Sequence, residues 1–75
     1  SNVEISNAKH IGNIMNKLIR MKDVKTITAL SPATIYRQMA MGKFPKAVKL
    51  TEKTSAWVEA EVIDFVEKRI ALRAT

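Results

Sequence analysis

Apolar side chains in the middle of the chain recur every three or four residues, which is the spacing of one helix face. The positions concerned are Met21, Val24, Ile27, Ile35 and Met39. They predict a helix of about two turns within residues 22–30, ending just before Ser31, and a second helix over residues 32–41. Two helices joined by a tight turn are typical of a helix-turn-helix, although the turn at residues 29–31 lacks the usual glycine.

The second helix has clear start and stop residues. The Ser31 hydroxyl can accept a hydrogen bond from an orphaned backbone N–H, and Pro32 then falls at the first helical position, where its missing donor costs nothing. Gly42 adopts a left-handed conformation cheaply and can therefore end the helix.

The pattern changes after Gly42. Phe44-Pro45 favours an extended exit, and alternating apolar and polar residues predict strands over residues 47–51 and 55–58, joined by a polar turn. The i, i+3, i+4 stripe of residues 59–72 predicts a last helix, with acidic residues at its start and basic residues at its end. Residues 18–20 suit a brief strand.

These elements predict a mainly α domain with a small β-hairpin, ordered short strand, helix, helix, two-stranded wing and helix. This is a winged helix-turn-helix over residues 18–75, preceded by a flexible arm or marginal helix at residues 1–17. Tyr36 is expected to be half-buried. The expected core is Ile19, Val24, Ile27, Leu30, Ile35, Met39, Phe44, Val48, Trp57, Val62, Phe65, Val66 and Ile70.

Composition narrows the class of protein. The 75 residues include no cysteine, which excludes a zinc finger and a cysteine nucleophile, and the single histidine, His10, has no metal-ligating neighbour. No apolar run approaches the roughly 20 residues that span a bilayer. We expect a cytoplasmic protein without metal or cofactor. Neither a phosphate-binding glycine loop nor a nucleophile motif is present, so we do not expect an enzyme.

Charge favours a polyanionic partner. The net charge is +6, and residues 1–58 carry ten basic against three acidic side chains, whereas residues 59–75 carry three against four. A basic body with a slightly acidic last helix is typical of nucleic-acid binding, although many small proteins are basic without such a partner.

The outer face of the second helix carries short, polar and singly basic side chains. Arg37 can donate two hydrogen bonds to guanine and Gln38 can pair with adenine, while Ala33 and Thr34 are small enough to allow close approach. We therefore predict base contacts in a major groove by Ala33, Thr34, Arg37 and Gln38. The alternatives are a solvated or phosphate-bound arginine and ordinary helix-forming side chains.

Phosphate contacts are predicted around this helix. Ser31 stands at the helix start, where backbone N–H groups attract anions, and simple capping is its alternative role. Four lysines follow the helix into the wing, and they suit phosphates on either side of the groove unless they form only a solvated face. These are Lys43, Lys46, Lys49 and Lys53.

The chain resembles a known family. Leu-Ser-x-x-Thr-Ile-Tyr-Arg at residues 30–37, Gly-Lys-Phe-Pro-Lys at 42–46, Val-Lys-Leu at 48–50, Trp57 and Glu-x-Glu-Val at 59–62 are similar to the AlpA-type prophage regulators. These regulators are related to phage excisionases and to the DNA-binding head of MerR regulators.

The resemblance implies a winged helix that acts as a transcriptional regulator or excisionase of a mobile element. It also implies a recognition helix at 32–41 and a wing at about 51–55. The wing here departs from the family, because it holds Glu52 where arginine and glycine are frequent. A second basic residue after Tyr36-Arg37 is also absent. Both departures affect how strongly the wing and the recognition helix are expected to bind DNA phosphates.

We expect double-stranded DNA as the partner and a monomer in solution, with cooperative binding on DNA left open. The alternative is a protein-interaction module that holds an integrase or another regulator without touching DNA. Salt dependence separates the two, since DNA binding through phosphates weakens steeply as salt rises.

Overall fold

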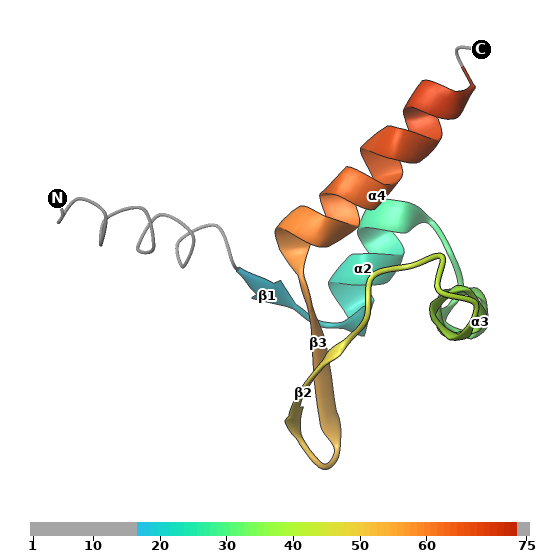
Figure 1. Cartoon of the computed structure of the whole chain (residues 1–75). Helices are drawn as coiled ribbons and strands as arrows, with labels where there is room; N and C mark the ends of the chain where they lie inside the picture. Colours follow the sequence, from blue (N-terminus) through green and yellow to red (C-terminus); the bar gives the residue numbers. More distant parts are fainter. Residues whose placement is uncertain (1–16, 74–75) are drawn as a thin grey trace, which may run out of the picture.

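A brief strand, two helices, a hairpin and a last helix follow one another in the predicted order (Figure 1). The computed structural model describes residues 17–73, so the predicted arm lies outside the described residues except for Lys17. The elements are β1 (Leu18–Ile19), α2 (Met21–Thr28), α3 (Pro32–Ala40), β2 (Val48–Thr51), β3 (Thr54–Val58) and α4 (Glu59–Leu72). The fold is a winged helix-turn-helix.

Helix α3 begins and ends as its local sequence predicts. The Thr34 N–H donates to the Ser31 hydroxyl over 3.2 Å, and Pro32 occupies the first turn. At the other end Gly42 has a φ of 72°, its N–H donates to the Met39 carbonyl over 3.0 Å, and the Lys43 N–H donates to the Gln38 carbonyl over 2.8 Å. This is the Schellman arrangement, which satisfies the last carbonyls of the helix.

Ala29 takes the conformation that a glycine usually supplies between α2 and α3. Its φ is 61°, and its N–H donates to the Lys25 carbonyl over 2.7 Å. The left-handed region costs an L-residue about 1–2 kcal/mol because of its Cβ. The tight turn between α2 and α3 therefore requires some backbone strain at Ala29.

The wing is part of a three-stranded antiparallel sheet in the order β1-β3-β2. Strand β3 pairs with β2 through Val48 and Ala56, and with β1 through Ile19 and Trp57. The Glu59 N–H, in the first turn of α4, donates to the Lys17 carbonyl over 2.8 Å. The base of the wing is thus fastened to the beginning of the described chain, which a simple two-stranded wing would not be.

The core lies between the sheet, α2, α3 and α4. Its buried residues are Ile19, Val24, Ile35, Phe44, Trp57 and Val62, and Met21, Ile27, Leu30, Met39, Ala47 and Phe65 pack against them.

Two predicted core residues were wrong. Val48 is 37% exposed because β2 is the edge strand of the sheet, and all four of its residues are exposed. Ile70 is 50% exposed because it lies in the last turns of α4, which extend beyond the other elements (Figure 1). Ala56, which the prediction omitted, is buried, and Tyr36 is 51% exposed, close to the half-burial expected of it.

Candidate nucleic-acid interface

Helix α3 turns one face to the core and another to solvent. Ile35 is fully buried, whereas Ala33 and Arg37 are exposed on the opposite side. Figure 1 shows α3 and the hairpin tip on the lower side of the molecule, with α4 rising from the other side. At Arg37, the helix face predicted to contact DNA bases is therefore covered neither by the hairpin nor by the last helix.

A chain of hydrogen bonds holds Arg37 in place. Its guanidinium Nη2 donates to Thr34 Oγ1 over 3.2 Å, and the Ser31 hydroxyl donates to the same oxygen over 3.0 Å. A guanidinium has five N–H donors, so most remain for a ligand. The helix cap, Thr34 and Arg37 thus form one ordered unit, which lowers the entropy lost when Arg37 binds.

Thr34 and Gln38 lie toward α4. Both are partly buried, and both line a shallow hollow with Phe65, Val66 and Arg69 of α4. The four predicted base-contacting residues are therefore not equivalent. Ala33 and Arg37 face outward, whereas Thr34 and Gln38 stand at the edge of that face.

The two wing lysines differ in what holds them. The Lys49 ammonium donates to the Glu52 carbonyl over 3.0 Å, across the hairpin turn. The Lys53 side chain has no such bond, although its backbone N–H donates to Thr51 Oγ1 over 3.2 Å. Both residues are exposed, and the strand pairing is irregular between Lys49 and Thr51.

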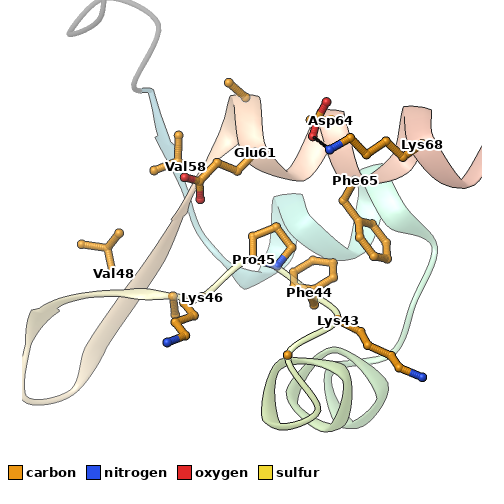
Figure 2. A pocket seen from close by; sticks show the side chains of 13 residues that line it. Lys43, Phe44, Pro45, Lys46, Val48, Val58, Glu61, Asp64, Phe65 and Lys68 are labelled. Atoms are coloured by element: carbon orange, nitrogen blue, oxygen red, sulfur yellow. Dashed lines mark ion pairs between the residues drawn. The ribbon is translucent and has the colours of Figure 1, made fainter.

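Lys43 and Lys46 belong to a different hollow, a groove between the segment after α3 and helix α4 (Figure 2). Phe44 and Phe65 close its floor with an edge-to-face contact of 4.7 Å between ring centroids. The far wall carries carboxylates, of which Asp64 pairs with Lys68 over 3.1 Å. In Figure 2 the side chains of Lys43 and Lys46 extend away from α4.

A third hollow lies between α2, α3 and the wing, and of its basic residues the sequence analysis predicted a role for Lys53 but not for Arg20 or Lys22. We call it the junction cleft, and it has a volume of about 350 Å³. It is lined by Arg20, Met21, Lys22, Tyr36, Lys53, Ser55 and Trp57. The pairing of β1 with β3 brings Arg20 to the base of the wing. The periodicity of the sequence does not predict that pairing.

The five predicted phosphate-contacting residues are therefore dispersed. Ser31 caps α3, Lys43 and Lys46 border the groove under α4, Lys49 bonds within the hairpin, and Lys53 enters the junction cleft. Within residues 17–73 no cluster of three metal-ligating side chains is found.

No helix in the described part of the chain is both long and apolar enough to cross a membrane.

Comparison with known proteins agrees with the fold and with the resemblance of the sequence. Residues 17–70 match the family model described as prophage CP4-57 regulatory protein (AlpA). The chain is also 37% identical over 57 residues to an uncharacterized protein, ORF88, of Enterobacteria phage P4. That match covers 76% of this chain and 65% of the relative's length, just under two thirds. Since the family model matches most of the chain, this protein belongs to the AlpA family of prophage regulatory proteins.

Proposed function

We propose that this protein is a sequence-specific DNA-binding regulator of a mobile element, which acts in the cytoplasm through a domain of residues 18–75. Helix α3 enters a major groove, where Arg37 and Ala33 contact base edges and Thr34 and Gln38 contact them from the margin. Ser31, Lys43, Lys46, Lys49 and Lys53 contact the flanking phosphates. The proposed activity is binding, with no chemical step.

The exposed Arg37 on α3 is the observation that carries this proposal. A major groove about 12 Å wide admits a helix, and a guanidinium matches the two acceptors of guanine. Arg37 is exposed, ordered by Thr34, and next to small side chains that allow close approach. Residues 17–58 carry nine basic and two acidic side chains, which supplies the attraction to phosphate.

Selection from a random duplex pool tests the proposal directly. The purified chain should enrich a short motif, and its affinity for that duplex should fall linearly on a logarithmic salt scale, with a slope of about −0.9 per phosphate contact. Arg37→Ala should lose preference at one base pair while its thermal unfolding stays unchanged. Absence of any enriched motif, together with salt-independent binding, would rule the proposal out.

Regulator and excisionase roles use the same contacts but differ in architecture on DNA. An excisionase occupies several adjacent sites and bends the duplex, at a cost of order 1–6 kcal/mol that its contacts repay. A regulator occupies a site near a promoter. Mapping the enriched motif onto the DNA that surrounds the gene, and measuring the bend by gel mobility, distinguishes the two.

The surface of helix α4 supports a second candidate function, which is binding to a protein such as an integrase. It carries four acidic against two basic side chains, and Ile63 and Ile70, seven residues apart, are 40% and 50% exposed. Residues seven apart lie on one helix face, so the two side chains point to the same side of α4. An integrase encoded nearby should then bind the wild-type chain without DNA and lose affinity for Ile70→Glu.

A further inference from the structure

The junction cleft gathers cations from segments that are distant in the sequence. Arg20 precedes α2, Lys22 lies in its first turn, and Lys53 comes from the turn of the hairpin. Asp23 and Glu52 neighbour these residues in the sequence, but no carboxylate lines the cleft. No ion pair within residues 17–73 involves any of the three cations.

Several other groups at the cleft can donate hydrogen bonds. No side chain caps α2, so the N–H groups of Met21 and Lys22, at its first two positions, have no side-chain acceptor. The start of a helix also carries a partial positive charge. Tyr36 and Ser55 add hydroxyl groups from α3 and β3.

Trp57 gives an independent sign that an acceptor is missing. The residue is 1% exposed and lines the cleft, yet its indole N–H finds no hydrogen-bond partner. Buried polar groups are almost always paired, and an orphan costs roughly 1–3 kcal/mol. The Tyr36 ring lies 6.3 Å from the Trp57 ring, at 57° to it, so the two aromatic residues pack together at the cleft.

We propose that the junction cleft is a seat for a single tetrahedral oxyanion, namely one phosphodiester group of the DNA backbone. Arg20, Lys22 and Lys53 supply its charge, and the start of α2 supplies backbone donors. Because Tyr36 belongs to α3 and Ser55 to the wing, the bound phosphate fixes both elements on the duplex at once. The seat therefore sets the register in which α3 reads bases. The inference rests on the proposed function.

The experiment neutralises one phosphate at a time. The duplex that the protein enriches from the random pool is synthesised with a single methylphosphonate linkage, which is moved along both strands. At one linkage the wild type should lose roughly tenfold in affinity, the scale of a lost charge-assisted hydrogen bond. Arg20→Ala, Lys22→Ala and Lys53→Gln should bind the intact duplex more weakly and no longer respond to that linkage.

Lys25→Ala is the matched control, since Lys25 is an exposed lysine of α2 that does not line the cleft. It should keep the full response to the sensitive linkage. The three lining side chains are themselves exposed, so the variants should fold, which their circular dichroism and thermal midpoint verify. If wild type and the cleft variants respond alike to every linkage while all bind DNA, the seat is refuted and the proposed function stands.

Trp57 is the only tryptophan of the chain and reports the cleft by its fluorescence. DNA should change its emission, and the methylphosphonate at the sensitive position should reduce that change. Inorganic phosphate alone should compete only weakly. Saturation by inorganic phosphate with no response to DNA would assign the cleft to a free small anion and overturn the backbone assignment. Failure of the wild type to bind any duplex would instead overturn the proposed function.

Discussion

Two regions of the molecule differ in their charge balance. The first is formed by α2, α3 and the hairpin, and the second is the last helix, α4. Residues 17–58 carry nine basic side chains against two acidic ones, whereas residues 59–73 carry three against four. On α4, Asp64 pairs with Lys68 within one helix face. Among the basic side chains of residues 17–58, only Lys17 forms an ion pair within the described residues. Its ammonium lies 4.0 Å from the Glu59 carboxylate. The first region therefore carries the excess of positive charge, +7 against −1, that attracts a polyanion.

The two regions also differ in what supports them. Helix α3 is anchored through Ile35, which is fully buried, and the wing through Trp57. The last turns of α4 have exposed apolar residues and extend from the body (Figure 1). The end of α4 is therefore less packed than the segments around Ile35 and Trp57, although α4 also has a fully buried residue, Val62.

The largest expected effect is on stability and concerns this anchoring. Ile35→Ala removes a fully buried side chain from the core and should cost about 2–5 kcal/mol in the free energy of unfolding. Ile70→Ala, on the exposed end of α4, should cost less than about 0.5 kcal/mol. Chemical denaturation measures both. Equal losses would mean that the end of α4 is as firmly packed as the buried face of α3.

The next effect concerns binding. Arg37→Ala should weaken specific binding by about 1–3 kcal/mol and relax preference at one base pair. Arg73→Ala removes the same charge from the exposed end of α4 and should leave the preferred sequence unchanged. Fluorescence anisotropy with matched and mismatched duplexes measures both. If the two variants behave alike, net charge and not contact explains the affinity.

A smaller effect is expected in the wing. Lys49→Ala should weaken binding to all sequences alike and lower the salt slope by about one contact. It also removes the bond to the Glu52 carbonyl, so Lys49→Met, which keeps the aliphatic stem, separates charge from packing. A salt slope that stays unchanged in both variants would exclude Lys49 from the interface.

The smallest effect concerns the turn. Ala29→Gly removes the Cβ at a φ of 61° and should leave the free energy of unfolding unchanged or raise it by up to about 1 kcal/mol, because relief of strain exceeds the entropy that glycine adds to the unfolded chain. DNA affinity should stay constant. A clear loss of stability would show that the Ala29 methyl group contributes packing.

Local sequence rules predicted the elements well, because their causes are local. Ser31-Pro32 and Gly42 act within one helical turn, so the limits of α3 could be read within a residue. Burial was harder to predict. The alternation around Val48 is that of a strand, but only the sheet order reveals that β2 is an edge strand, and all four of its residues are exposed.

The candidate site was predicted in part. The outward positions of Ala33 and Arg37 follow from helical geometry alone. The lysines after α3 were treated as one group, yet Lys43 and Lys46 line one hollow, Lys53 lines another, and Lys49 bonds within the hairpin. Arg20 and Lys22 were missed because a non-local pairing, Ile19 with Trp57, carries them to the wing. Strand pairings of this kind cannot be predicted from the periodicity of a sequence.

The direct passage from β3 into α4 has a mechanical consequence. Val58 ends the strand and Glu59 begins the helix, with no linking residue between them, and the Lys17 carbonyl fastens the joint. Because no flexible segment separates the two elements, we expect the direction of the last helix to be coupled to the direction of the hairpin.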